Sequence, residues 1–562
     1  ANADTAQNVA ALASLNASAA RDIAFFGGFG VHANANAFDP NAVTATADAK
    51  LNAGGRVYVG GDVDVTAFAS THGTIDGLTN TVKANAQLSV AANEGAIFGG
   101  TSYSLHSGQQ VFGGDITVTA DERSHHANNG SAIANANLHA ATFDRIRSDG
   151  LEVLGNVLVE ADAQGAFSGR NVKAMASLDA SADDAASFAG NITVLGSALD
   201  SGNGNVTAIS KLHLFASSIQ VGDVLANHNI GGHVLVEANA NALGETQNVN
   251  ALASFSGIAN SGSGNLAISG PVKVTADALA TADGRSVQAV ADLFLAANSN
   301  LTLPGAVVLA DAVASGFVSY INAQADMYLL GERKVDVTQN GLFAQANASA
   351  SSAGHGGTAN ALIQVNGGHD VVIDGNVDAI AVVLSNHSSN LARALIDIEA
   401  GTSGSGSLTM VSNIEALALA DPRNDHATAG VTLNAEDNIL VFGQDPIADA
   451  HAGDGVTAFL QTHFTTNLTQ PGSSGSTANA FIHIRSVDGS VIFINGLNND
   501  QVGALRALAS DYPNTNSGSL TAIELLIDGL DCGVLGSADA QNGKGEACAK
   551  SAFNIGETDT PP

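Results

Sequence analysis

The chain has 562 residues, including 53 acidic and only 20 basic ones, so its formal net charge is −33. This balance has the wrong sign for a nucleic-acid binder, which needs clustered Lys and Arg, and it argues against binding to anionic lipid. A hydrophobic fraction of 45% excludes a disordered chain. No apolar run approaches the ~20 residues that cross a bilayer, so no membrane insertion is expected.

The main pattern is an alternation of small apolar and polar residues. In residues 82–90, Val82, Ala84, Ala86, Leu88 and Val90 stand at alternate positions with polar residues between them. A period of two predicts a half-buried β-strand, because successive side chains of a strand point to opposite faces.

This alternation returns along the chain, in steps of roughly 33 to 50 residues. It begins again near Val9, Val43, Ala134, Val172, Ala208, Val249, Val287, Ala323, Ala359, Ala392, Ala429 and Ala478. A second phrase, Gly, a small polar residue and then alternating Val or Ile, lies between the copies, for example from Gly61, Gly114 and Gly190. Glycine permits the sharp corner that would begin such a strand.

These phrases predict an all-β, elongated, parallel β-helix-like solenoid of about 13 units of roughly 39 residues each. Alanines at matching depth predict a thin core whose two walls lie close together. A tandem array of antiparallel hairpins is the alternative, since it would also pair Ala with Ala and Val with Leu.

Residues 1–500 are expected to form the repeat region, which becomes more irregular after about residue 400. Residues 501–562 are expected to form a C-terminal segment, in which residues 501–509 fit a short helix and 557–562 a frayed tail. Cys532 and Cys548, the two cysteines, lie 16 residues apart. In a secreted protein such a pair is expected to form one disulfide.

The Gly-Asn-Ile-Thr-Val phrase at 190–194 and its copies resemble the filamentous haemagglutinin-like surface proteins of bacteria. The resemblance covers roughly residues 1–500, although the repeat unit here is longer than in that family. It implies a right-handed parallel β-solenoid, secretion, and a role in adhesion or in cell-surface fibres.

No catalytic motif is recognisable, and no cofactor is expected. Three acidic pairs, Asp62 with Asp64, Asp183 with Asp184, and Asp374 with Asp378, are the candidates for a polysaccharide-acting β-helix enzyme or for incidental calcium binding. Arg and Lys are scarce and Trp is absent, so we expect the protein not to be an enzyme.

The first functional hypothesis is a structural subunit of an extracellular fibre, biofilm or cell-surface matrix, polymerising head to tail with itself through terminal strand edges. The alternative is a monomeric adhesin stalk that binds a cell-surface or glycan receptor. Because the chain begins at Ala1 rather than Met, it is expected to be a mature secreted product, located outside the cell or on its surface.

Overall fold

A computed structural model describes residues 2–3, 8–38, 42–72, 81–93, 95–98, 114–124, 131–142, 150–165, 171–222, 232–245, 248–353, 356–388, 390–411, 413–423, 426–442, 447–452, 477–486, 490–494, 504–511, 520–529, 531–533, 535–542 and 546–555. These residues form strands β1 to β41 and no helix. The chain divides into two compact units. The boundary between them lies at residues 289–299, where residues 289–293 belong to unit 2 and residues 294–298 to unit 1. Unit 1 precedes this region and unit 2 follows it.

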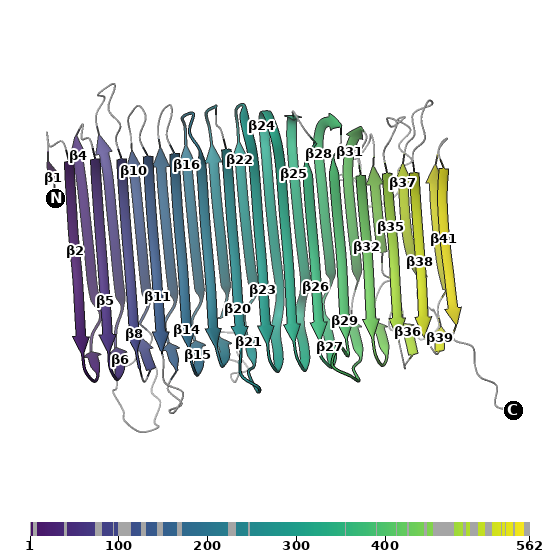
Figure 1. Ribbon diagram of the computed structural model, residues 1–562, viewed down its shortest axis with the longest axis horizontal. Helices are drawn as coiled ribbons and strands as arrows, with labels where there is room; N and C mark the ends of the chain where they lie inside the picture. Colours follow the sequence, from purple (N-terminus) through teal and green to yellow (C-terminus); the bar gives the residue numbers. More distant parts are fainter. Residues whose placement is uncertain are drawn as a thin grey trace. The chain divides into compact units, whose positions relative to one another are not determined.

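Each turn of unit 1 consists of three strands, and each strand pairs in parallel with its counterpart in the next turn (Figure 1). The first wall is built from β2 (Asn8–Ala19), β5 (Ala42–Ala53), β8 (Thr81–Ala92), β11 (Ser131–Thr142), β14 (Asn171–Ala182), β17 (Val206–Ala216) and β20 (Asn248–Ala259). The base contains β3 (Ile23–Phe25), β6 (Arg56–Val59), β9 (Gly95–Phe98), β12 (Leu151–Val153), β15 (Ala185–Phe188), β18 (Ser218–Val221) and β21 (Leu266–Ile268). The second wall contains β1 (Asn2–Ala3), β4 (Phe29–Phe38), β7 (Val63–His72), β10 (Ile116–Ser124), β13 (Val157–Gly165), β16 (Ile192–Asp200), β19 (Val234–Ala242) and β22 (Val272–Ala280).

Unit 2 repeats the same parallel pairing, with β23 (Gly284–Ala297) contributing residues to both units. It begins with two long strands, β24 (Asn300–Gly331) and β25 (Lys334–Ala353), that run continuously around the corners. The other strands are β26 (Thr358–Gly367), β27 (Asp370–Asp374), β28 (Val377–Ser388), β29 (Leu391–Ala400), β30 (Leu408–Val411), β31 (Ile414–Arg423), β32 (His426–Ala435), β33 (Ile439–Phe442), β34 (Ile447–Ala452), β35 (Thr477–Ser486), β36 (Ser490–Ile494), β37 (Ala504–Asp511), β38 (Leu520–Gly529), β39 (Asp531–Gly533), β40 (Leu535–Asn542) and β41 (Glu546–Ile555).

The predicted parallel β-solenoid is therefore confirmed, and the alternative hairpin array is wrong. Every pairing whose register is described is parallel, and Val43 lies opposite Val82 just as Val9 lies opposite Val43. An antiparallel array would instead pair each long strand with its neighbour in sequence.

The expected short helix over residues 501–509 is also wrong, because residues 504–511 form β37. This strand pairs in parallel with β34 and with β40, and Ala507 lies opposite Ala448. The ladder of the solenoid thus overrides a local sequence that is compatible with a helix. The expected tail over residues 557–562 lies outside the described residues.

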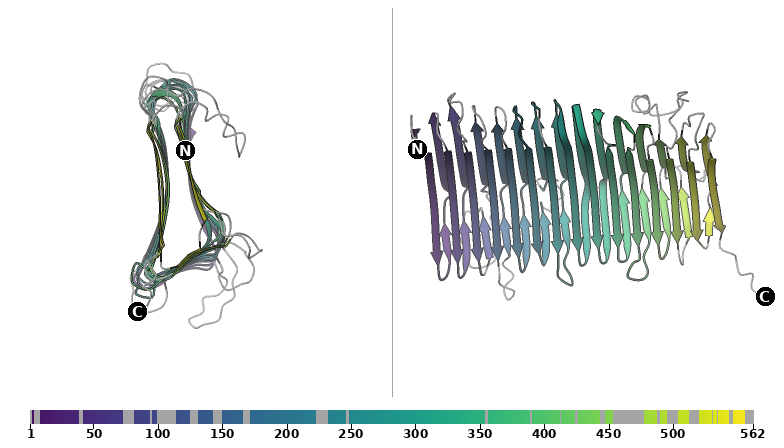
Figure 2. Two further views of the ribbon diagram at one scale, coloured as in Figure 1. Left: turned by 90° about the vertical axis from the view of Figure 1, so that its right-hand side faces the viewer. Right: turned by 45° about the horizontal axis from the view of Figure 1, so that its top comes forward.

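Viewed along the stacking direction, a turn is a flattened triangle with two facing walls and a short base (Figure 2). The core between the walls of unit 1 is built from small side chains at alternate positions. Ala45 and Ala47 of the first wall and Ala67 and Ala69 of the second are all completely buried. Alanine at these positions lets the two walls approach closely, as the sequence predicts.

The corners before β7, β10, β13, β16 and β19 are held by a ladder of polar side chains. The Oδ1 atom of Asp62 accepts a hydrogen bond from the backbone N–H of Asp115 at 2.9 Å. Asp115 accepts one from Asn156 N–H at 2.8 Å, and Asn156 accepts one from Asn191 N–H at 2.9 Å. The bonds satisfy exposed backbone donors at a place where the strands turn. They explain why a polar residue follows the glycine in the repeated phrase.

The glycines of this corner are needed because successive turns stack with almost no space between their backbones. A Cβ atom at Gly155 would collide with the carbonyl group of Gly114 in the preceding turn. The repeated glycine is therefore a packing requirement of the ladder.

Candidate functional site

The three predicted acidic pairs lie at separate places in the fold. Asp62 lies at a corner of unit 1 and Asp64 on the outer face of β7, Asp183 and Asp184 form part of the turn after β14, and Asp374 and Asp378 lie on either side of a corner of unit 2. Within unit 1, Asp62 and Asp64 belong to the second wall and the corner before it, whereas Asp183 and Asp184 lie in the turn after the first wall, so these two pairs are separate. Among the described residues, no three His, Cys, Asp or Glu side chains lie together in a way that could hold a metal ion.

Cys532 and Cys548 lie on two different ladders of unit 2. Cys532, in β39, pairs in register with Val491, and Cys548, in β41, pairs with Ala522. Their side chains lie outside the described part of the structure, so the disulfide stays a prediction. None of the described residues belongs to a helix that is long and apolar enough to cross a membrane.

Two carboxylates meet on the outer face of the second wall of unit 2. Asp378 in β28 lies directly opposite Glu415 in β31, and Phe343 of β25 lies on its other side. Partial burial disfavours the charged form of Asp378, and the neighbouring charge of Glu415 adds to this, so the pKa of Asp378 rises to about 6.

A similar pair lies in the same unit, with Asp292 in β23 and Asp326 in β24. Burial raises the pKa of Asp292 to about 6, and the charge of Asp326 contributes to the increase. Burial also raises the pKa of Asp326, although a hydrogen bond donated by Gln324 and the charge of Arg393 oppose it. Neither pair has the third acidic ligand that a cation site would need within the described residues.

A polar groove crosses one corner of unit 2, with a volume of about 390 Å³. The groove is lined by basic and acidic side chains together, namely Arg333, Lys334, His369, Asp370 and Asp437. Lys334 Nζ already lies 2.8 Å from Asp336, and His369 Nδ1 lies 2.9 Å from the carbonyl oxygen of Ser405. The groove is open and of mixed charge, and it was not predicted because its residues come from corners far apart in sequence.

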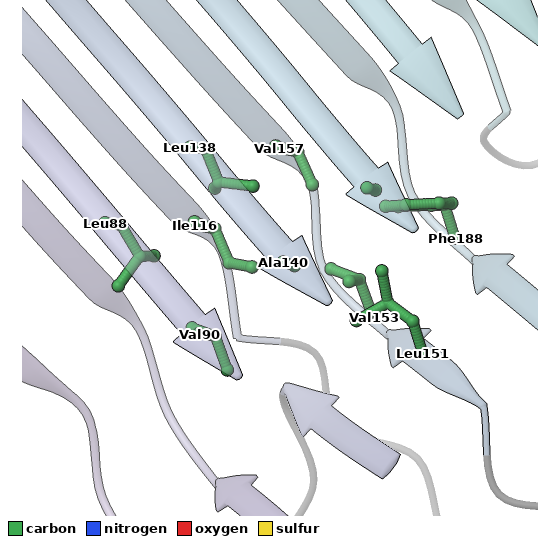
Figure 3. Close-up of a pocket in the computed structure, with 10 residues that line it drawn as sticks. Leu88, Val90, Ile116, Leu138, Ala140, Leu151, Val153, Val157 and Phe188 are labelled. Atoms are coloured by element: carbon green, nitrogen blue, oxygen red, sulfur yellow. The ribbon is translucent and has the colours of Figure 1, made fainter. Parts of the chain in front are cut away.

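A second, apolar space lies inside unit 1 and is only about 10 Å³ in volume (Figure 3). Ala140 and Ala180 line it at a depth where the preceding turn has Val90 and the following turn has Leu214. An apolar space of this size is at the lower limit for one water molecule. It is therefore a packing gap in the core and has no room for a ligand.

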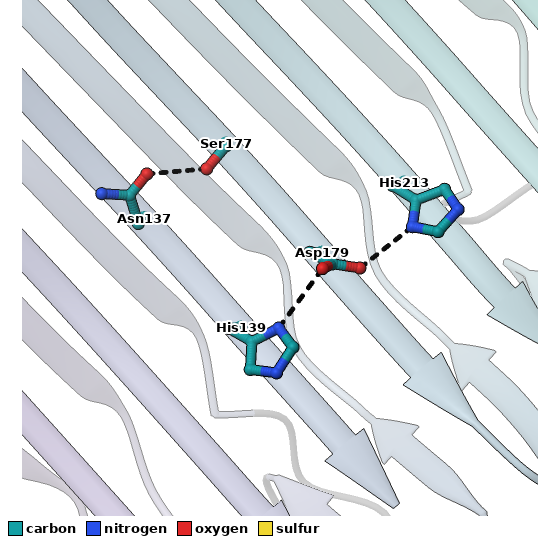
Figure 4. A network of polar contacts seen from close by, with 5 residues as sticks. All are labelled: Asn137, His139, Ser177, Asp179 and His213. Carbon is teal, nitrogen blue, oxygen red and sulfur yellow. Dashed lines mark hydrogen bonds and ion pairs between the residues drawn. The ribbon is translucent and has the colours of Figure 1, made fainter.

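The outer faces of unit 1 carry short polar networks between turns (Figure 4). The two oxygens of Asp179 contact His139 Nδ1 at 3.4 Å and His213 Nδ1 at 3.0 Å, one histidine from each neighbouring turn. Beside them, the hydroxyl group of Ser177 donates a hydrogen bond to Asn137 at 2.7 Å. These groups satisfy one another along the ladder.

Strand β2, the first long strand, differs from the strand after it, β5, in its pairing and in its exposure. Within the described residues, β2 pairs along one edge only, with β5. Its core-facing Ala13 and Leu15 are partly exposed, whereas the residues opposite them in β5, Ala47 and Ala49, are completely buried. The core-facing side chains of β2 are thus less covered than those of β5.

The exposed apolar surface of unit 1 is concentrated in the same turn. Leu12 of β2 and Phe26, at the corner between β3 and β4, are each 75% exposed. The 12 residues of β2 include no charged residue and no proline. Charges and proline are the usual devices that prevent an edge strand from pairing with another chain.

Comparisons with known proteins add no relative: no protein-family model, no curated protein and no solved structure matches the chain. The resemblance to filamentous haemagglutinin-like proteins therefore stays a prediction from the repeated phrases.

Proposed function

We propose that this protein is a structural subunit that assembles head to tail with copies of itself through the exposed edge of β2. The observation that carries the proposal is the edge itself, which is long, uncharged and open to the core. An unpaired edge of this kind is a template for another strand, because its free N–H and C=O groups are satisfied by pairing.

The other partner in the contact is the last long strand of a second copy. Within the described residues, β41 pairs along one edge only, with β38, and that pairing is parallel. A β41 strand placed against β2 would continue the parallel ladder of the solenoid from one copy into the next. Because the two contacting surfaces differ, the contact is heterologous and leads to an open filament.

The setting that suits such a subunit is outside the cell. We propose a secreted protein of an extracellular fibre, a biofilm or a cell-surface matrix, as the acidic composition and the repeated phrases predict. The net charge of −33 keeps individual filaments soluble through mutual repulsion.

A matched pair of variants tests the edge. L12K/N16K places two lysines on the outer face of β2. Thr46 and Lys50 of β5 lie opposite Leu12 and Asn16, so T46K gives β5 the same two lysines. Negative-stain imaging of the purified protein should show end-to-end chains for the native protein and for T46K, and single particles for L12K/N16K. Uniform single particles of the native protein at high concentration, or an equal loss of chains in T46K, would contradict the proposal.

A monomeric adhesin stalk is the second candidate, and the polar groove of unit 2 favours it. Arg333 and His369 are exposed there and line a groove of about 390 Å³. This candidate predicts single particles that bind an immobilised glycan and lose that binding in R333A/H369A.

A further inference from the structure

The two walls of unit 1 differ in the sign of their outward charges. On the first wall, the described outward side chains include Lys50, Lys83, Lys173 and Lys211, against Asp48 and Asp179. On the second wall, they include Asp64, Asp121, Glu160, Asp162, Glu237 and Asp277, against Arg123 and Lys273. In a chain with 53 acidic and 20 basic residues, the first wall stands out as a basic surface.

Part of this charge has no opposite charge nearby. Lys50 and Asp48 pair at 2.9 Å, and Arg123 and Asp121 pair at 3.0 Å. In the described part of the chain, Lys83 and Lys173 form no ion pair.

The unpaired lysines belong to a triplet that follows the register of the first wall. Lys83 of β8 lies opposite Ile133 of β11, and Ile133 lies opposite Lys173 of β14. Each step is one strand spacing of about 4.8 Å, so the two lysines stand about 10 Å apart with an aliphatic residue between them. We name Lys83, Ile133 and Lys173 the basic triplet.

The second wall contains a triplet of the same spacing and opposite charge. Glu160 of β13 lies opposite Leu195 of β16, and Leu195 lies opposite Glu237 of β19. The two carboxylates are therefore also about 10 Å apart, with an aliphatic residue between them. We name Glu160, Leu195 and Glu237 the acidic triplet.

We propose that two copies of this protein pack side by side, with the basic triplet of one copy against the acidic triplet of the other. Both triplets are set by the same strand spacing, so copies with parallel axes bring both lysine–glutamate pairs and the Ile133–Leu195 contact into place together. The triplets lie on opposite walls of one solenoid, so they cannot meet within a single copy. Each copy presents one triplet on either side, and the contact can be repeated laterally.

This contact is independent of the strand edge, because it uses the walls of unit 1 and not β2. Exposed ion pairs are individually weak, so a single side-by-side contact is short-lived. Copies already joined end to end would make many such contacts at once, and the contacts would then hold filaments together as bundles. Long-range repulsion between acidic copies is screened beyond about 10 Å at 0.1 M salt, whereas the touching pairs are screened less.

Zero-length carbodiimide cross-linking tests the proposal, because it joins a lysine to a carboxylate only where the two touch. Equal amounts of ¹⁴N- and ¹⁵N-labelled full-length protein are mixed in 0.1 M NaCl, cross-linked and mapped by mass spectrometry. We expect mixed-isotope peptides that join Lys83 or Lys173 to Glu160 or Glu237, with at least a fivefold decrease at 0.5 M NaCl. Their absence while other carboxylate–lysine cross-links form would overturn the proposal.

Charge-reversal variants test whether the two triplets cause the side-by-side association. K83E/K173E should reduce side-by-side association. The association is measured by low-speed pelleting and by cross-linking of the first wall of one copy to the second wall of another through the lysines that the variant retains. The quadruple variant K83E/K173E/E160K/E237K should restore it by exchanging the two charges. K211E/K273E, which changes the net charge as much as K83E/K173E but lies outside both triplets, is the matched control.

Two results would overturn the lateral contact: equal loss in the control, or no recovery in the quadruple variant. If the protein binds a sulfated polysaccharide column through the basic triplet and forms no mixed-isotope cross-links, this surface is assigned to an anionic polymer instead. L12K/N16K should keep the cross-links even though it abolishes end-to-end chains, so failure of one proposal is distinguishable from failure of the other.

Discussion

Gly196 and Ser210 lie at the same depth of the core on opposite walls, and the missing side chain of the glycine makes room for the serine. Ser210 replaces the alanine of the neighbouring turn, Ala176, and is completely buried. Its hydroxyl group donates a hydrogen bond of 2.5 Å across the core to the carbonyl oxygen of Glu237. A Cβ atom at Gly196 would lie 2.9 Å from that hydroxyl oxygen and 2.9 Å from the backbone carbonyl oxygen of Ile209.

The pair predicts a non-additive response to mutation. Gly196→Ala overpacks the core and should lower the free energy of unfolding by about 1–3 kcal/mol. The cost should fall in part in a Ser210→Ala background, which removes the contact with the hydroxyl oxygen but leaves the contact with the backbone carbonyl oxygen of Ile209. Denaturant unfolding of the four variants in this cycle measures the coupling, and equal costs of Gly196→Ala in both backgrounds would contradict the account.

The stacked corner makes a second prediction. Gly155→Ala should destabilise unit 1 by several kcal/mol, on the order of the largest single-residue effects, because the new methyl group meets backbone and not a movable side chain. Gly262→Ala is the control, since a Cβ atom at Gly262 meets nothing within 4 Å. Thermal unfolding followed by circular dichroism compares the two, and a similar melting temperature for both variants would refute the packing role of Gly155.

The carboxylate pairs of unit 2 predict a pH-dependent stability. The pKa values of Asp292 and Asp378 are raised to about 6 in the folded protein, above the ordinary value of 3.8. The folded state therefore binds these protons more tightly than the unfolded state, and the stabilisation present below pH 4 is lost as the pH rises towards and through 6.

Asp292→Asn and Asp378→Asn remove the ionisation at these two positions. Each should raise the free energy of unfolding at pH 7.5 by about 1 kcal/mol after allowance for solvent screening, with a much smaller effect at pH 4. Asp374→Asn, at an exposed corner, is the control. Denaturant unfolding at the two pH values gives the comparison, and a gain that is the same at both would show that the carboxylate charge is not its cause.

Much of the fold follows from local pattern, because in a solenoid each turn repeats the same core. The alternation of Val82, Ala84 and Ala86 predicts both the strand and the thin interior, and the structure confirms both. Residues 504–511 show the limit of such reasoning. Their alanine and leucine positions fit a helix as well as a strand, and only the ladder on β34 decides between them.

The candidate surfaces were less accessible to sequence reasoning, because they depend on register across turns of unequal length. Lys83 and Lys173 are separated by two turns of 50 and 40 residues, as Val82, Ala132 and Val172 of the same ladder show. No fixed sequence period reveals that they stand in one column. The open edge of β2 is different, since the absence of charge in residues 8–19 is visible in the sequence.

Hydrogen–deuterium exchange of β2 as a function of protein concentration tests the central claim, that copies join through this strand. If β2 pairs with a strand of another copy, backbone amides within residues 8–19 should become at least tenfold more protected between low and high micromolar concentration, while L12K/N16K shows no change. Exchange from β2 that is independent of concentration, in a native sample whose particles are nonetheless joined end to end, would contradict it.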